Sequence, residues 1–310
     1  MKQAGSKYHY SCLEEDEKII YQKIYDAVLS FKPSITIKKI ETSKLFEIIN
    51  AIIYDQPLLF YWNNRNIPII KTMLGIKLIL KYDYQEAEVN LLWKQIQNQI
   101  KEMMKMITPN MKLLTKQIII HRWMQSHITI AKPPYDKDCH NIVGAFIKKC
   151  CVCEGFAQAY KLICDQLKIA SIVVRGKAIT PEGKIELHAW NMTRIDGICS
   201  HIDVTWDTVY GIGSYDYFNI TDDEISVDHQ FDRRLYPTCN HNELSYYVKN
   251  KMIANNKQEL QQIIAANSHQ NSFSVQLKYT FHVKDISNSI YQIRYNTARK
   301  VLFLKRRGTK

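Results

Sequence analysis

Apolar residues recur at helical spacing along much of the chain, which predicts a series of amphipathic helices. The most regular pattern is in residues 155–167, where five large or small apolar side chains share one helix face. These are Phe156, Ala159, Tyr160, Ile163 and Leu167. The predicted helices cover residues 14–30, 43–54, 86–106, 114–126, 155–167 and 242–265.

Short apolar or alternating runs predict strands between these helices and after them. The predicted strands cover residues 58–62, one or two strands within 68–84, then 170–174, 187–194, 199–206, 272–282 and 300–304, with a strand or helix over 289–295. Because most strands follow a series of helices, the pattern indicates the α+β class with a late antiparallel sheet. The chain has no repeat with a period of 20–50 residues, which argues against a solenoid.

One hairpin is predicted in enough detail to place side chains. The Asp-Gly pair at 196–197 stands between two alternating runs and is typical of a two-residue type I′ turn. With that turn, Trp190 faces Asp203, and His188 is the diagonal neighbour of Asp203 on the same sheet face. The Asp203 carboxylate can then reach the His188 imidazole. A loop one residue longer would put them on opposite faces.

Composition narrows the class of protein. The 310 residues are 46% hydrophobic and 23% charged, with few Gly and Pro, which excludes a disordered or collagen-like chain. A net charge of +12 invites a nucleic-acid partner or an anionic surface. However, no helix-turn-helix, RNP-like or zinc-finger pattern is present, and the basic end at 305–310 is typical of a solvated terminus. We therefore expect a protein or peptide partner and no nucleic acid, with the charge favouring acidic substrates.

The N-terminal residues suggest a compartment. The first 17 residues contain no apolar signal-peptide region, and the apolar stretch 69–80 is interrupted by Lys71 and Lys77. That stretch is also too short to cross a bilayer. We expect no membrane span and a cytoplasmic protein, or a secreted one if a signal was removed. The spacing of the eight cysteines does not form a small disulfide scaffold, and the oligomeric state is not predicted.

Cys153 stands at the start of the most regular predicted helix. A helix N-terminus carries partial positive charge, which favours the thiolate form of a cysteine placed there. The backbone N–H groups of the same turn can hold a developing oxyanion. Together with the predicted hairpin, this gives a candidate triad in which His188 exchanges a proton with Cys153 and Asp203 orients the imidazole.

Three separated blocks carry a family resemblance. Residues 153–160 (CEGFAQAY), 188–191 (HAWN) and 203–207 (DVTWD) resemble, in this order, bacterial members of the transglutaminase-like superfamily. The segments IHRW, NIVGAF and YFNIT also resemble that family, and the resemblance covers about residues 115–250. Just before the nucleophile, this chain has Lys-Lys-Cys-Cys where small residues are common.

The resemblance implies a papain-like core in which a helix bearing the nucleophile packs on an antiparallel sheet bearing His and Asp. Residues 113–310 would form this catalytic core, and residues 1–112 an N-terminal α+β extension. The implied activity is thiol acyl transfer on peptide or side-chain amide bonds, without a cofactor or metal. We favour hydrolysis slightly over transamidation, because water is the default acceptor in an open cleft. The alternative is a non-catalytic protein-binding module with the same fold.

Other interpretations of the cysteines stay open. Cys150 and Cys153 form a CxxC pair that Cys139 and His140 could complete as a metal site, although a second CxxC is missing. A thioredoxin-like redox pair would need a surrounding βαβ pattern, which is absent. Cys153 as a merely buried thiol is a further alternative. For Cys151, packing at the helix edge is favoured over a disulfide with its neighbour.

Several neighbours of the candidate triad receive secondary predictions. His201 shares the predicted sheet face and is either a second base or, as we favour, a polar neighbour. Trp190 is expected in the wall of the site, whereas Trp206 falls on the opposite face and is expected in the core. A side-chain oxyanion donor, such as Asn141, Gln158 or a tyrosine, is left open.

Overall fold

A computed structural model describes residues 7–180, 182–282, 286 and 290–308. Residues 1–6, residue 289 of the predicted 289–295 element and the last two residues of the basic end lie outside these ranges. The helices are α1 Tyr8–Ser11, α2 Glu15–Leu29, α3 Thr42–Asp55, α4 Glu86–Met104, α5 Leu113–His127, α6 Cys153–Gln166, α7 Val204–Tyr210, α8 Asp222–Ile225, α9 Tyr246–Lys249 and α10 Lys257–Ala266. The strands are β1 Ser34–Ile37, β2 Trp62–Asn63, β3 Ile69–Thr72, β4 Gly75–Ile79, β5 Lys81–Tyr82, β6 Thr129–Ile130, β7 Cys150–Cys151, β8 Ala170–Ile179, β9 Ile185–Ile195, β10 Ile198–Ile202, β11 Phe218–Ile220, β12 His229–Gln230, β13 Ile253–Ala254, β14 Ser272–Leu277, β15 Tyr291–Asn296 and β16 Val301–Arg306.

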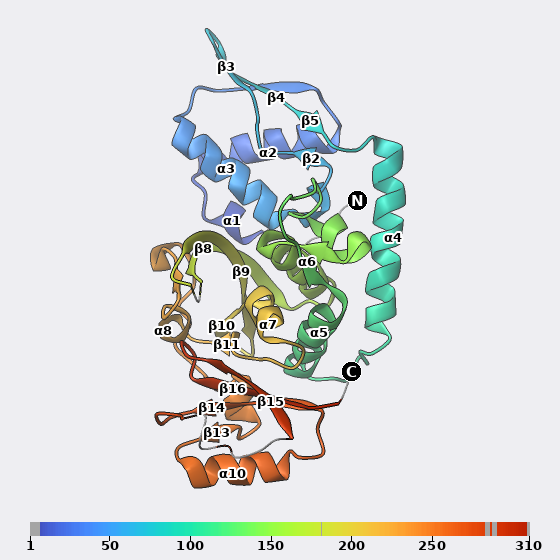
Figure 1. Cartoon of the computed structure of the whole chain (residues 1–310). Helices are drawn as coiled ribbons and strands as arrows, with labels where there is room; N and C mark the ends of the chain where they lie inside the picture. The colour runs from blue at the N-terminus through green and yellow to red at the C-terminus, as the bar shows by residue number, and fades with distance from the viewer. Residues whose placement is uncertain (1–6, 181, 283–285, 287–289, 309–310) are drawn as a thin grey trace.

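The elements are arranged in three tiers along the length of the molecule (Figure 1). Helices α2 and α3 and the strands β1 to β5 form one end, and the sheet of β13 to β16 with α10 forms the other. Between them lies a sheet with the strand order β11-β10-β9-β8-β12, in which every neighbouring pair is antiparallel. Helices and antiparallel sheets in one chain confirm the predicted α+β class.

Helix α6 packs against β8 and β9 at the centre of the molecule. Every residue from Gly155 to Cys164 is buried, so the helix is covered on all sides rather than along one stripe. A helix on an antiparallel sheet is the architecture that the family resemblance implied for the core. It fixes the N-terminus of α6, and with it Cys153, relative to the strand that carries His188.

Four predicted elements differ from the structure in type or extent, and one of them, the strand expected over 272–282, ends at Leu277. Residues 58–62 were expected to form a strand, but Pro57–Leu59 is a short 3-10 helix and strand pairing begins only at Trp62. The run is apolar because it is buried, and a short buried run does not distinguish a strand from a helical turn. The expected helix 242–265 is divided into α9, β13 and α10, because β13 pairs in parallel with β14.

The strand predicted over 199–206 ends at Ile202. Asp203 is the N-cap of α7, and its side chain accepts a hydrogen bond from the Trp206 N–H. Asp is among the best N-cap residues, since its carboxylate satisfies an N–H group of the first helical turn. Capping therefore replaces strand pairing at this point.

The N-terminal part is joined to the central sheet by polar contacts as well as by packing. In α1, the His9 ring hydrogen-bonds to the Val173 carbonyl of β8 at 2.9 Å. The Asp55 carboxylate at the end of α3 accepts hydrogen bonds from the His9 and Tyr10 N–H groups. One large hydrophobic cluster includes buried residues from Ile20 to Leu304 and so joins both parts of the chain; the division between 1–112 and 113–310 stays a prediction.

Candidate active site

The β9–β10 hairpin has the turn and register that the sequence predicts. Asp196 and Gly197 have φ values of 51° and 83°, both in the left-handed region that a type I′ turn requires. The pairing runs from Ile198↔Ile195 to Ile202↔Asn191. The predicted hairpin register, on which the proximity of His188 and Asp203 was based, is therefore confirmed as far as Ile202.

The structure brings His188 and Asp203 together, although Asp203 lies beyond the strand. The Asp203 Oδ2 atom accepts a hydrogen bond from His188 Nε2 at 2.5 Å, and Oδ1 accepts one from the Trp206 N–H at 3.0 Å. Both side chains are buried. Helix capping thus fixes one carboxylate oxygen of Asp203 and aims the other at the imidazole.

Cys153 is the first residue of α6 and is partly exposed, at the open side of the same site. Burial by itself would lower the pKa of His188. The charge of Asp203, its hydrogen bond and the adjacent Cys153 thiol outweigh that effect and raise the pKa of His188 to about 10. Burial would likewise raise the pKa of Asp203, but the His188 charge and hydrogen bond hold it below its ordinary range. The site therefore favours the protonated form of the His188 imidazole, which lies between the Asp203 carboxylate and the Cys153 sulfur.

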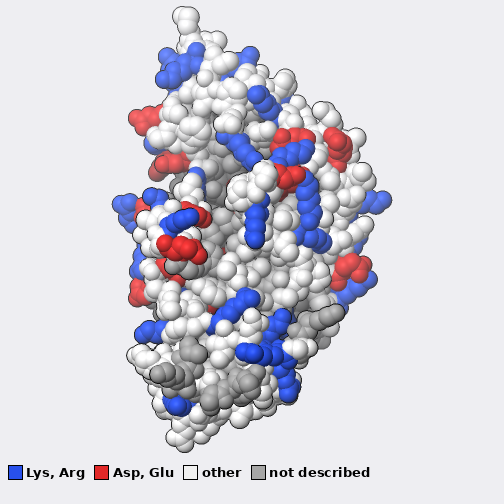
Figure 2. Space-filling view, in the orientation of Figure 1, with Lys and Arg blue, Asp and Glu red and all other residues white. Residues whose placement is uncertain are grey.

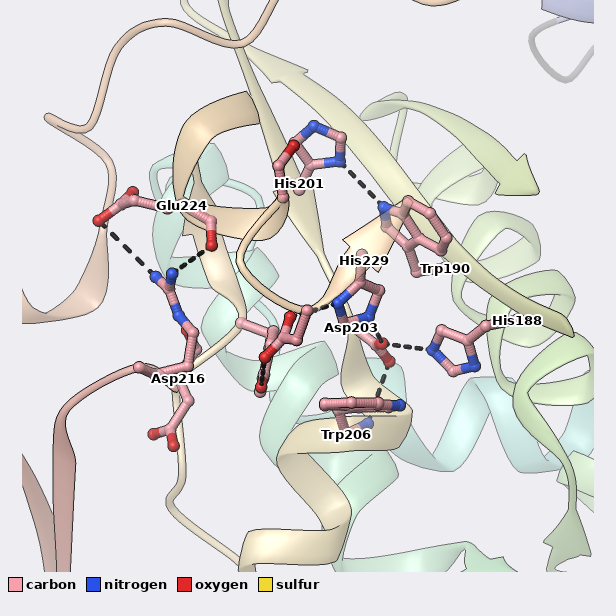
Figure 3. A network of polar contacts seen from close by, with 12 residues as sticks. His188, Trp190, His201, Asp203, Trp206, Asp216, Glu224 and His229 are labelled. Carbon is pink, nitrogen blue, oxygen red and sulfur yellow. Dashed lines mark hydrogen bonds and ion pairs between the residues drawn. The ribbon is translucent and has the colours of Figure 1, made fainter. Parts of the chain in front are cut away.

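A second histidine, which the sequence did not predict, holds the other side of Asp203. His229 Nε2 lies 3.1 Å from Asp203 Oδ2, and its Nδ1 lies 2.6 Å from Asp228 Oδ1. The Tyr217 hydroxyl donates to the other oxygen of Asp228 at 2.6 Å. Figure 3 shows His188 and His229 on either side of Asp203. In the sequence, residues 228–229 are an Asp-His pair with no pattern that links them to the site. They reach the site only because β12 pairs with β8.

Aromatic rings enclose the two histidines. The His188 ring lies 5.9 Å from both the Trp190 and the Trp206 ring centroids, and His229 lies 5.0 Å and 4.7 Å from the same two rings. Trp190 packs on both histidine rings but is buried and does not line the cleft, so the expected place in its wall is taken by Trp206 instead. The prediction that Trp206 packs in the core on the opposite face is wrong, since Trp206 is on α7, where strand alternation no longer applies.

His201 is a buried polar neighbour of the site. Its Nδ1 accepts a hydrogen bond from Trp190 Nε1 at 2.9 Å, and its Nε2 lies 2.8 Å from Asp222 Oδ1. Burial lowers the pKa of His201. Both ring nitrogens are thus occupied by other side chains, which fits the favoured prediction better than a second base.

Cys153 and His188 open into a cleft of about 820 Å³. A smaller cavity of about 190 Å³ adjoins it and shares Glu154 and His140 with it. Of the candidate oxyanion donors, Asn141 and Gln158 line the smaller cavity, whereas three tyrosines line the cleft itself: Tyr54, Tyr135 and Tyr210.

Among the described residues, potential metal ligands gather in two groups, each with its ligand atoms within 4.8 Å of one another. The groups are His188 with Asp203 and His229, and His201 with Asp222 and Cys239. Hydrogen bonds between imidazole and carboxylate account for both clusters. The predicted alternative set around the CxxC pair is not one of them within the described part of the chain. All eight cysteines are free thiols.

Two further observations concern the distribution of surface charge and the apolar character of the helices. Lys and Arg are interspersed with Asp and Glu over much of the face shown in Figure 2, so the net charge of +12 is not gathered there in a single patch. Within the described residues, no helix combines the length and the apolar character needed to cross a membrane.

Comparison with known proteins gives only distant likenesses. No family model and no curated protein sequence matches this chain. The chain is similar to a candidate cysteine protease from Cytophaga hutchinsonii, with 14% identity, a TM-score of 0.31 and coverage of 45% of this chain and 61% of that chain. It is also similar to a TGase (14% identity, TM-score 0.33, coverage 56% and 50%) and to the periplasmic domain of TgpA from Pseudomonas aeruginosa (12%, 0.28, 43% and 54%).

These alignments span between 50% and 61% of the known chains. Their identities and TM-scores are too low to carry an argument about activity. What can be inferred about function therefore depends on the residues and geometry of this chain.

Proposed function

We propose that the protein is a cysteine-dependent acyl-transfer enzyme of the transglutaminase-like type. It acts on peptide or side-chain amide bonds through Cys153, His188 and Asp203, with hydrolysis slightly favoured over transamidation. The observation that carries the proposal is the hydrogen bond between buried Asp203 and His188, with His188 and Cys153 both lining one open cleft. Residues 113–310 would be the catalytic core and residues 1–112 an extension.

In the first half of the reaction, the Cys153 thiolate attacks the carbonyl carbon of the substrate amide. The new carbon–sulfur bond forms, the carbon–nitrogen bond breaks, and the amine leaves with a proton from His188. The high pKa of His188 keeps this proton available at neutral pH. The N–H groups of the first turn of α6 would donate hydrogen bonds to the developing oxyanion.

In the second half, neutral His188 removes a proton from water or from an acceptor amine. That nucleophile adds to the thioester carbon, the carbon–sulfur bond breaks, and the Cys153 thiolate is restored beside protonated His188. Water gives a carboxylic acid, and an amine gives a new amide. Asp203 acts as a positioning residue, because it holds the imidazole orientation and stabilises its positive charge.

The test is to incubate the wild type and Cys153→Ala with a set of peptides and proteins, and to detect both cleaved and cross-linked products by mass spectrometry. Cys150→Ala is the matched control, since it removes a half-buried thiol three residues away. We expect products with the wild type and the control, and none with Cys153→Ala. Products that persist in Cys153→Ala would contradict the proposal.

Thiol alkylation at pH 6 separates an active dyad from a binding module. Cys153 should react faster than the other thiols, and this advantage should disappear in His188→Ala. A folded wild-type protein that forms no product and shows equal reactivity of its accessible thiols would instead support the non-catalytic protein-binding module.

A further inference from the structure

Helix α3 of the N-terminal extension presents a second apolar stripe to the cleft. One set of apolar residues on this helix is buried in the core, including Leu45, Ile48 and Ile52. Another set recurs at intervals of three or four residues and lines the cleft. Its apolar members are Phe46, Ile49, Ile53 and Tyr54; the polar Asn50 lies among them, and Ile49 is also part of the core. The extension therefore forms one wall of the cavity into which Cys153 opens.

The two ends of this stripe differ in exposure. Tyr54 is buried with Ala157 of α6 and Ala189 of β9, which anchors the last turn of α3 beside the nucleophile helix. Phe46, two turns earlier, is 47% exposed although it is large and apolar. The helix is thus held firmly at one end and offers an uncovered aromatic ring at the other.

Two further exposed apolar side chains line the same cleft from other elements. Leu187 on β9 is 70% exposed, and Val209 on α7 is 54% exposed. Single exposed apolar side chains are common on folded proteins. Three from three different elements in one concavity, around a candidate nucleophile, are typical of a binding site.

The charged lining residues have both signs, which gives the cleft no strong preference for a charged substrate. They are Arg65, Arg175, Glu154, Glu182 and Glu186. This balance differs from the net charge of the whole chain and argues against an acidic substrate as the main ligand of the cleft.

We propose that the cleft takes an extended peptide segment with large apolar side chains next to the amide bond attacked by Cys153, and that α3 supplies one wall of this subsite. The inference rests on the proposed function and adds a substrate class to it. Phe46 contacts an apolar side chain of the substrate from one wall, and Leu187 or Val209 contacts one from the other.

The experiment measures kcat/KM for short N-acetylated, C-amidated peptides in which one residue at a time is Leu, Phe, Ser or Glu. Wild type is compared with Phe46→Ser, Val209→Ser and the control Leu91→Ser. Leu91 is 59% exposed on α4 and does not line the cleft. An apolar contact of this size is worth about tenfold or more in discrimination.

We expect wild type and Leu91→Ser to prefer Leu or Phe over Ser and Glu by about tenfold or more at one or two positions. Phe46→Ser should lose most of this preference while Cys153 alkylation stays unchanged, which shows an intact dyad. Activity that depends on Cys153 but has no apolar preference, or an equal effect of Phe46→Ser and Leu91→Ser, would overturn this inference alone. Absence of any Cys153-dependent product would overturn the proposed function, and this inference with it.

Discussion

His229 gives the sharpest test of how the site is held together. His229→Leu removes the 3.1 Å contact to Asp203 Oδ2 and leaves the Trp206 N–H and His188 as the hydrogen-bond partners of Asp203. A hydrogen bond to a charged group contributes about 1.5–3 kcal/mol. If the whole of that loss appears as poorer orientation of His188, kcat/KM falls by about ten- to 150-fold.

The same variant has a predictable effect on acid stability. The hydrogen bond and the charge of His229 help to hold the pKa of Asp203 below its ordinary range, so their removal raises that pKa. A depressed carboxyl pKa contributes stability that is present above about pH 4 and is lost as the pH falls toward the folded-state value. In His229→Leu the folded-state pKa of Asp203 lies closer to the unfolded-state value, so this acid-labile contribution should be smaller, and its loss should be complete at a higher pH than in wild type.

The assay is the pH profile of kcat/KM together with urea unfolding at several pH values. His229→Gln, which keeps an amide donor, should recover much of the rate. His201→Leu is the matched control, because His201 is equally buried against a carboxylate but does not touch Asp203. The reasoning is refuted if folded His229→Leu keeps kcat/KM within about twofold of wild type, or if His201→Leu shifts the pH profile equally.

Three further predictions test separate parts of the structure. Asp203→Asn removes the charge that raises the pKa of His188 to about 10, so the alkaline fall in kcat/KM should move to lower pH. The rate should also drop roughly 10³- to 10⁴-fold. An unchanged alkaline limb of the pH profile would contradict this prediction. Gly155→Ala places a Cβ 2.7 Å from the Cys151 Cβ. This overlap should lower the free energy of unfolding, measured by urea titration, by about 1–3 kcal/mol. An unchanged unfolding midpoint would show instead that the helix can shift to make room. Dialysis against EDTA should leave the rate of amide cleavage unchanged, since the thiol is the nucleophile; a loss that zinc restores would assign the histidine pair to a metal.

Local chemistry in the sequence was sufficient for the hairpin. The Asp-Gly pair at 196–197 fixes a two-residue turn because only such residues accept positive φ at both positions at low cost, and the turn then sets the register of every pair as far as Ile202. The regular spacing of apolar residues similarly predicted α6, and its first turn located Cys153. These features depend on contacts between residues close together in the chain.

The position of Asp203 shows where such reasoning becomes incomplete. Alternation along a strand placed it near His188, but its actual role as the N-cap of α7 depends on a helix that strand parity cannot predict. The contact to His188 forms all the same, because both alternatives keep Asp203 at the end of β10. Trp206, three residues later, is displaced from the core to the cleft by the same change.

The sequence by itself determined the nucleophile helix, the hairpin and the order of the Cys, His and Asp blocks, because local spacing and turn chemistry govern each of them. The tertiary structure alone brought His229 and Asp228 to the far side of Asp203, and α3 to the rim of the cleft. Those contacts join segments that are far apart in the sequence and meet only through sheet pairing or through packing between elements. Such long-range packing is set by how whole surfaces fit together, and no short stretch of sequence records it.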